Sequence, residues 1–365
     1  MNNHAATHLE HVQKLLDDPL HVARAAARAG TRVVGYLGND VPVAVIAAAG
    51  ALPLRLRGLA SVSTARADQF LESAFTPESR AIAESWLNGE FDFIDVVVFP
   101  RTDDSAQRLY YYLSELQRRR LCGGPRPLLY DVANIARATS VEHTRDSTRR
   151  LALELGTADA QLADAARRVE HRVALSAEIA ARCAADAPLL GSIAWRLQRA
   201  SAYDWQESFD VATRQWLEGA PRLAGPRRIV LAGDPPPDVA LHQAIEDAGA
   251  SVVLELTESG ADVPSTHLPD IDAIADAFHA RRNPVLAMRE NPQWILDRAR
   301  LVHADAVLFW LIEQNEALPW EIARQQRSLE AASVPTLLLA RQPSPVTDHS
   351  IRLVREFVSK LEIKR

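Results

Sequence analysis

The sequence predicts an α/β protein in which two parallel-sheet domains are joined by a helical region. Short apolar runs rich in Val, Ile and Leu alternate with segments whose apolar residues have helical spacing. This alternation occurs once in each half of the chain, and a long stretch with helical spacing lies between the halves. Strands that are apolar throughout and alternate with helices are typical of a parallel sheet covered on both faces.

The first domain is predicted within residues 1–131. Its strands are expected at residues 32–37, 93–99 and 127–130, and its helices at 43–49 and 106–118. Near the N-terminus His4, His8 and His11 recur at i, i+4 and i+7. This spacing places three imidazoles on one helical face. We expect an exposed amphipathic helix there rather than a metal site, because a metal would need a further ligand and a buried position.

The helical region is predicted at residues 132–223 and the second domain at 224–365. In the helical region Gly156 is expected to end one helix, and the next is expected to begin near Asp159. Strands of the second domain are expected at residues 228–232, 251–256, 304–310 and 336–340, and helices at 239–248, 292–302, 319–331 and 351–361. The last helix should pack back on a sheet.

The two halves also resemble each other in sequence. Residues 33–40 lead into a helix that closes at Gly50, and residues 229–235 lead into one that closes at Gly249. The pattern indicates a duplicated α/β domain, although a shared architecture without common ancestry would leave a similar trace.

Composition excludes several classes of protein. The formal net charge is -6, with 41 Lys+Arg against 47 Asp+Glu, and no block of like charges marks a site for nucleic acid or an anionic membrane. The longest apolar run, residues 41–54, is shorter than the roughly 20 residues needed to cross a bilayer. Residues 1–8 lack the features of a secretory signal, so a cytoplasmic protein is expected.

Cysteine usage is equally informative. The chain has 2 cysteines, Cys122 and Cys183, with no CxxC pair. A disulfide framework and an autonomous thiolate metal site are therefore excluded. Both residues are expected to be reduced structural thiols, and Cys122 is the alternative candidate for a nucleophile.

The expected ligand site lies in the loops that follow the strands, because ligands of open parallel sheets bind at the carboxyl ends. These loops are residues 38–42, 100–105, 233–237 and 312–319, and they are expected to face one cleft between the domains. The substrate-binding candidates are Asn39, Asp40, Ser105 and Asp234. The candidate catalytic carboxylates are Asp103, Asp104, Glu313 and Glu316.

No GxGxxG, GxxxxGK[ST], HExxH or GxSxG motif supports a dinucleotide, P-loop, zincin or hydrolase site.

The most distinctive polar cluster is Asp103-Asp104-Ser105. A carboxylate pair can bind a hard cation or share a proton in a closed cleft. The same residues can instead cap the helix expected from residue 106, where they would accept hydrogen bonds from free amides. We favour capping.

Several segments resemble the 2-hydroxyacyl-CoA dehydratase and benzoyl-CoA reductase family. They are Val33-Val34-Gly35-Tyr36, Val41-Pro42, residues 48–56, Thr76-Pro77-Glu78-Ser79-Arg80, residues 99–105, residues 162–172, residues 229–233 and Trp320-Glu321. The resemblance is to the cluster-bearing subunits rather than to the ATP-dependent activator. It implies two Rossmann-like or flavodoxin-like domains.

The same resemblance implies an iron–sulfur cluster that this chain does not match. Family members hold a [4Fe-4S] cluster with three cysteines, and the corresponding positions here are Thr76, Asp103 and, within about one residue, Asn315. Oxygen-bearing side chains are poor replacements for thiolates. We therefore expect no cofactor and no metal bound by this chain, with the [4Fe-4S] cluster in a partner subunit.

The resemblance makes a dehydratase-like subunit the first functional hypothesis. The chain would pair with a homologous cluster-bearing subunit, or with itself as a dimer, and act on an acyl-CoA thioester. The alternatives are a stand-alone non-redox enzyme or an acyl-CoA or metabolite-binding protein that uses an acidic interdomain cleft. Carboxylates crowded in such a cleft would have raised pKa values suited to proton transfer.

Overall fold

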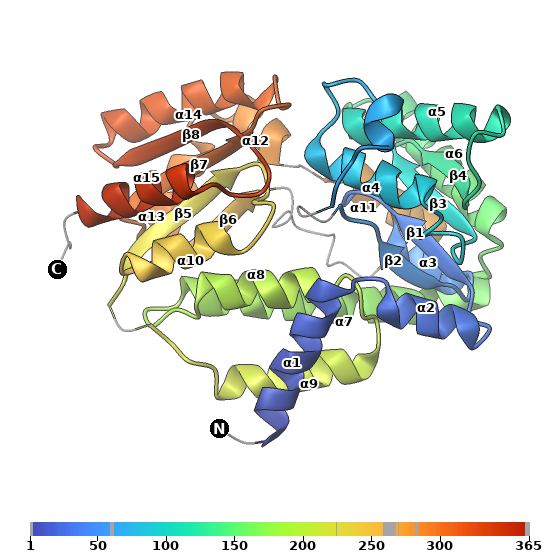
Figure 1. Ribbon diagram of the computed structural model, residues 1–365, viewed down its shortest axis with the longest axis horizontal. Helices are drawn as coiled ribbons and strands as arrows, with labels where there is room; N and C mark the ends of the chain where they lie inside the picture. The colour runs from blue at the N-terminus through green and yellow to red at the C-terminus, as the bar shows by residue number, and fades with distance from the viewer. Residues whose placement is uncertain are drawn as a thin grey trace. The chain divides into compact units, whose positions relative to one another are not determined.

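A computed structural model describes residues 3–58, 62–223, 225–257, 268, 270–281 and 284–361, with side chains from residue 7 onward. The chain divides into two compact units (Figure 1). Unit 1 comprises Met1–Leu175, Arg199–Val211 and Asp262–Arg281, and unit 2 comprises Ser176–Gln198, Ala212–Ala261 and Arg282–Arg365. Residues 132–223, predicted as the helical region, are distributed over both units.

Unit 1 contains one parallel sheet with the strand order β2-β1-β3-β4. The strands are β1 (Val33–Tyr36), β2 (Leu52–Arg55), β3 (Val96–Pro100) and β4 (Arg126–Tyr130). Every residue of β3 is buried, which explains its continuous run of Val and Phe. Strand β2 was not predicted. It has four residues and contains Pro53, which an edge strand tolerates because one side of its backbone makes no ladder bonds.

Helices cover both faces of this sheet. One core cluster joins it to α3 (Val43–Ala48), α6 (Ala138–Leu155), α7 (Asp159–Ala184) and α11 (Ile271–Ala280). On the other face lie α4 (Pro77–Leu87) and α5 (Asp104–Arg118), where the Phe99 ring is 6.1 Å from that of Trp86 and 5.9 Å from that of Tyr110. Helix α2 (His21–Arg28) contacts β1 and β2, and the short η1 (Ala67–Gln69) contacts α4.

The N-terminal helix α1 (Asn3–Asp17) forms as predicted, but His8 on its histidine face is buried rather than exposed. His8 is 6% exposed, and its ring lies 5.5 Å from that of Phe209. His11 Nε2 lies 2.9 Å from Asp204 Oδ2. Burial lowers the pKa of His8 to about 4, so this side chain is neutral at pH 7. The side chain of His4 lies outside the described residues.

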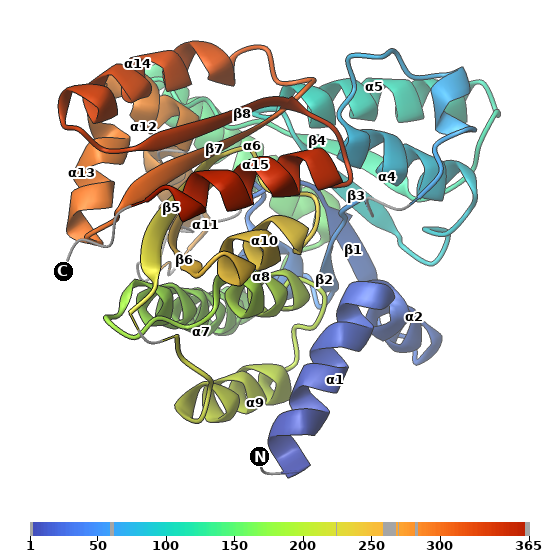
Figure 2. The same cartoon turned by 60° about the vertical axis from the view of Figure 1, so that its left-hand side comes forward.

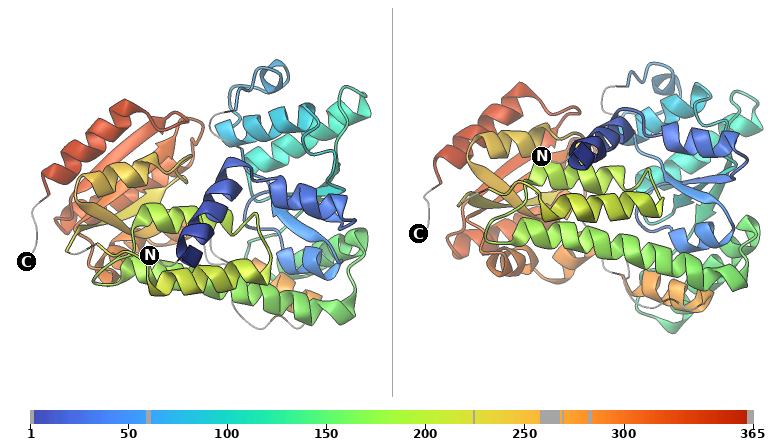
Figure 3. Two further views of the ribbon diagram at one scale, coloured as in Figure 1. Left: turned by 60° about the horizontal axis from the view of Figure 1, so that its bottom comes forward. Right: turned by 90° about the horizontal axis from the view of Figure 1, so that it is seen from below.

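The middle of the chain is helical, as predicted. Helix α6 ends at Leu155, with Gly156 at its C-cap in the left-handed conformation. Helix α7 then runs for 26 residues as one continuous element (Figure 3). It is followed by α8 (Gly191–Ala200) and α9 (Glu207–Glu218).

Unit 2 contains a second parallel sheet with the order β6-β5-β7-β8. Its strands are β5 (Arg227–Gly233), β6 (Ala250–Thr257), β7 (Ala306–Ile312) and β8 (Thr336–Gln342). Helices α10 (Ala240–Asp247) and α15 (Asp348–Ser359) pack on one face, and α12 (Pro284–Glu290), α13 (Trp294–Leu301) and α14 (Leu318–Ala331) on the other (Figure 2). Val354 and Val358 of α15 are fully buried, which confirms that the last helix packs on a sheet.

Both sheets therefore have the same strand order. In each unit the first strand along the chain lies between the second and the third, and the fourth lies next to the third. This is the beginning of a flavodoxin-like arrangement, and it confirms the predicted fold class of two parallel-sheet domains. Within the described residues, no helix is both long enough and apolar enough to span a membrane.

Candidate functional site

Each sheet has a point at which the direction of strand addition reverses. In unit 1 it lies between β1 and β3, and in unit 2 between β5 and β7. The loops that leave the carboxyl ends of these strands are the four loops predicted from the sequence. Ligands of open α/β sheets bind at such points, so the predicted residues occupy the expected edge of each sheet.

In unit 1 the candidates Asn39 and Asp40 are held by a buried arginine. Arg281 Nη1 donates hydrogen bonds to Asp40 Oδ1 at 2.6 Å and to the Asn39 carbonyl oxygen at 2.7 Å. Thr102 Oγ1, from the loop after β3, donates to Asp40 Oδ2 at 2.6 Å. The Arg281 side chain is 5% exposed and comes from a segment far along the chain, so no local sequence signal revealed it. These contacts bridge the loops after β1 and β3.

Two helices of unit 1 begin beside each other at this edge. Thr76 caps α4 by accepting a hydrogen bond from the Ser79 amide at 3.2 Å. The Ser79 hydroxyl in turn lies 2.9 Å from the hydroxyl of Ser105 in the first turn of α5. The structure thus brings the candidate Ser105 together with the position of Thr76.

Asp103 caps α5, which confirms the capping interpretation. Its Oδ1 accepts a hydrogen bond from the Ala106 amide at 2.9 Å. Burial raises the pKa of Asp103, and the amide hydrogen bonds from Ala106 and Ser105 oppose that rise. Asp104 differs, because its side chain is 85% exposed and lies 3.8 Å from Arg108.

In unit 2 a corresponding polar bridge joins the loops after β5 and β7. Asp234 accepts hydrogen bonds from the Ile312 amide at 2.9 Å and from Asn315 Nδ2 at 2.7 Å. Asn315 Oδ1 accepts from the Leu318 amide at 3.0 Å, at the start of α14. Burial raises the pKa of Asp234 to about 6 despite these hydrogen bonds.

Gly233 sets the position of Asp234. Its φ is +115°, and a Cβ there would lie 2.3 Å from the Trp310 carbonyl oxygen. A side chain at position 233 is therefore excluded by both conformation and space. The chain can turn directly from β5 towards β7 only with glycine there.

The other predicted carboxylates of unit 2 face solvent. The Glu313 side chain is 51% exposed and pairs with Arg341 at 2.6 Å, and Glu316 is also exposed. Of the four candidate catalytic acids, Asp103 is the one with reduced solvent access, and a catalytic role for any of them stays a prediction. The described part of the chain contains no group of three or more His, Cys, Asp or Glu side chains able to hold a metal ion.

Comparison with known proteins now places the chain in a family. The family model described as 2-hydroxyglutaryl-CoA dehydratase, D-component, matches residues 39–353. The chain belongs to the 2-hydroxyglutaryl-CoA dehydratase D-component family. Curated proteins gave no match to the chain. The matched range of this D-component family member includes the polar bridges of both units and all three positions at Thr76, Asp103 and Asn315.

The side chains at these positions of the D-component family member do not fit an iron–sulfur cluster. They offer a hydroxyl, a carboxylate and an amide oxygen, and each of these oxygens accepts a hydrogen bond at the start of a helix. Cluster iron is held by soft thiolates. Burial raises the pKa of the Cys183 thiol to about 12 and also raises that of Cys122. Both thiols therefore stay protonated at neutral pH.

A group of arginines in unit 1 of the D-component family member was not predicted from the sequence. Arg55 ends β2, Arg57 follows two residues later, and Arg199 lies near the end of α8. The available signal was the alternation Leu54-Arg55-Leu56-Arg57, which places two charges on one face of an extended segment. It was overlooked because β2 was not predicted.

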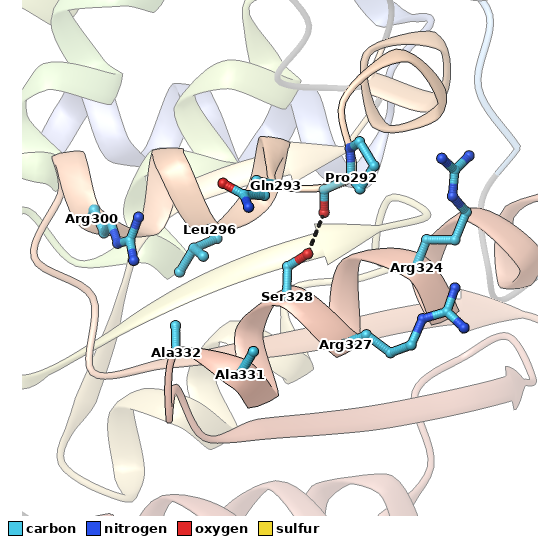
Figure 4. A pocket seen from close by; sticks show the side chains of 9 residues that line it. All are labelled: Pro292, Gln293, Leu296, Arg300, Arg324, Arg327, Ser328, Ala331 and Ala332. Carbon is cyan, nitrogen blue, oxygen red and sulfur yellow. Dashed lines mark hydrogen bonds between the residues drawn. The ribbon is translucent and has the colours of Figure 1, made fainter.

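A separate surface groove lies between α13 and α14 in unit 2 (Figure 4). Its volume is about 480 Å³, and Arg300, Arg324 and Arg327 are among its lining residues. The Ser328 hydroxyl donates to the Pro292 carbonyl oxygen at 2.9 Å within it. None of the predicted site residues lines this groove.

Proposed function

We propose that this chain is a subunit of a 2-hydroxyacyl-CoA dehydratase-type enzyme that binds no cluster of its own. It would act on an acyl-CoA thioester together with a homologous cluster-bearing subunit. The observation that supports this proposal is that Thr76 and Asp103 are N-cap residues and that Asn315 accepts a hydrogen bond from an amide at the start of α14. The resemblance assigns these positions to cluster cysteines, and here the side chains satisfy backbone amides instead.

The chemistry of the iron ligands explains why the cluster would be bound by the partner and not by this chain. Hydroxyl, carboxylate and amide oxygens are hard donors, whereas iron–sulfur clusters need cysteinate ligands. Single-electron transfer would therefore be the task of the partner. This chain would supply a docking face and part of an acyl-CoA pocket, with Asn39, Asp40, Ser105 and Asp234 as the candidate substrate-binding residues.

The test is purification without oxygen, followed by iron analysis and visible spectroscopy. The chain would be prepared alone and together with a cysteine-bearing homologue, and dehydration of a 2-hydroxyacyl-CoA would be followed by mass spectrometry. We expect a colourless chain alone, and iron and dehydration in the pair. About four irons per chain, bound by this polypeptide alone, would overturn the proposal.

A cysteine-free version of the chain provides the matched control. Cys122→Ser combined with Cys183→Ala removes every thiol from this polypeptide. If the partner holds the cluster, the pair should keep its iron and its activity with this variant. Loss of iron from a pair that still assembles would show that this chain contributes ligands.

The alternative is a stand-alone enzyme without redox chemistry, and Asp234 is the observation that favours it. Burial raises the pKa of this carboxyl to about 6, which suits a group that exchanges a proton near neutral pH. The alternative predicts turnover of an acyl-CoA by the chain alone in the presence of air. It also predicts loss of that turnover in Asp234→Asn.

A further inference from the structure

Arg55 ends β2 at the carboxyl edge of the unit 1 sheet, Arg57 follows it, and Arg199 lies near the end of α8. Arg55 is in register with Tyr36 of the neighbouring strand, so the two side chains leave the same face of the sheet. The positive charge of Arg57 acts on both Arg55 and Arg199. Arg57 thus lies within electrostatic reach of both other guanidinium groups.

Arg57 and the neighbouring Gly58 both lie against α4. Arg57 Nη1 lies 4.0 Å from Glu78 Oε1 in the first turn of α4, and the Arg57 side chain is 8% exposed. Gly58 allows this approach, because a Cβ there would lie 2.5 Å from the Glu78 carbonyl oxygen and 2.7 Å from Ala81 Cβ. The segment after β2 is therefore held directly against α4.

Arg55 has a guanidinium nitrogen that lacks a hydrogen-bond partner. Its Nε is shielded from solvent and has no hydrogen-bond partner, and the described residues provide no ion pair to its guanidinium. Burial lowers the pKa of Arg55 to about 10, the neighbouring charge of Arg57 contributes to the change, and the Glu78 carboxylate opposes it. A shielded guanidinium nitrogen without a hydrogen-bond partner is unfavourable.

An oxyanion would accept a hydrogen bond from the Arg55 guanidinium. Guanidinium groups present planar, forked donors that match carboxylate and phosphate oxygens. Like charges held together against desolvation are typical of functional sites. We propose that Arg55, Arg57 and Arg199 form a binding site for the carboxylate or phosphate group of a small-molecule ligand. The site lies within unit 1 and needs neither iron nor a partner subunit. Its test is therefore independent of the test of the proposed function.

Titration calorimetry on the isolated full-length chain tests the site, with thermal unfolding as a second readout. Inorganic phosphate, succinate and free coenzyme A would serve as three separate probes, which distinguish a phosphate ligand from a carboxylate ligand. We expect at least one probe to bind and to raise the unfolding temperature. No binding of any probe at millimolar concentration would overturn the proposal.

Arg55→Met separates binding from a structural role. The variant should bind the effective probe at least about tenfold more weakly, since a hydrogen bond to a charged group is lost. Without ligand it should unfold at a higher temperature than the wild type, because an unpartnered charge has been removed from a shielded position. Arg55→Lys keeps the charge without the fork and should bind with intermediate affinity.

The exposed Arg28 provides the control, and Arg28→Met should change neither affinity nor unfolding temperature. Unchanged affinity in both Arg55 variants would place the anion elsewhere and overturn the proposal. A lower unfolding temperature of ligand-free Arg55→Met with full affinity would do the same, since it would assign the residue to the fold alone.

Discussion

Asn315 Nδ2 donates a hydrogen bond of 2.7 Å to Asp234 Oδ1 and joins the loops that leave the two central strands of unit 2. The oxygen of the same amide side chain accepts a hydrogen bond from the amide of Leu318, the first residue of α14. Asn315 therefore ties the start of a helix to a carboxyl group whose pKa is raised to about 6 by burial. The protonation state of Asp234 should be visible in the stability of the protein.

The first prediction concerns the pH dependence of unfolding. The folded-state pKa of Asp234 is about 6, above the ordinary value of 3.8. The folded protein therefore holds this proton more tightly than the unfolded chain, and the stabilisation is complete below about pH 4. It should be lost as the pH rises through 6, by about 3 kcal/mol at most.

Asp234→Asn should remove this contribution. Urea unfolding at several pH values between 4 and 7 would give the difference in unfolding free energy between wild type and variant. That difference isolates Asp234, because other groups such as His8 titrate in both proteins. An unchanged difference across this range would contradict the prediction, and Asp104→Asn at an exposed position is the control.

The second prediction separates the two neighbouring carboxylates at the start of α5. Asp103→Ala removes the N-cap and should lower the free energy of unfolding by about 1 kcal/mol. Asp103→Asn keeps an acceptor for the Ala106 amide and should retain most of that stability. Asp104→Ala, at a largely exposed side chain, should change stability by less than about 0.5 kcal/mol. Chemical denaturation of the three variants checks this order, and equal losses in both alanine variants would contradict it.

The third prediction concerns the buried ion pair of unit 1. Arg281→Met leaves the Asp40 carboxylate without its cation and should lower the free energy of unfolding by about 3 kcal/mol. Adding Asp40→Asn removes the uncompensated charge, so the double variant should be more stable than Arg281→Met by about 1 kcal/mol or more. A double-mutant cycle measures this coupling. Strictly additive effects would show that the pair contributes no mutual stabilisation.

The fourth prediction tests the close approach at Gly58. Gly58→Ala places a Cβ against the backbone of α4 and should destabilise the protein by about 1–3 kcal/mol. It should also weaken binding of the oxyanion probe, because Arg57 must move with the segment. Gly123→Ala is the matched control, since a Cβ there meets no atom within 4 Å. Equal unfolding midpoints for the two variants would refute the steric argument.

The fold could be predicted from the sequence where local patterns determine the structure. Strand β3 was predictable because a run buried on both faces is apolar throughout, and the cap at Asp103 because it depends on residues only three positions apart. Strand β2 was missed because it is short, contains Pro53 and ends in arginine. The burial of His8 and the pairing of His11 depend on remote partners such as Asp204, which lies 193 positions from His11.

The same distinction applies to the candidate site. The loops at the carboxyl edges were predictable, since parallel sheets place ligands there. The arginines were not, because Arg281 reaches the loop after β1 from a segment far along the chain, and Arg199 belongs to α8, far from β2 in sequence. Charged residues from segments far along the chain cannot be recognised in the sequence pattern of the strands that they approach.

The hydrogen bonds of Thr76, Asp103 and Asn315 have a consequence for substitution at these positions. Cysteine lacks the side-chain oxygen that accepts a backbone amide in each case, so a thiol at any of them would leave the first turn of a helix less well satisfied. Under the proposed function, a return to cluster-binding cysteines would therefore remove three hydrogen bonds from the starts of helices.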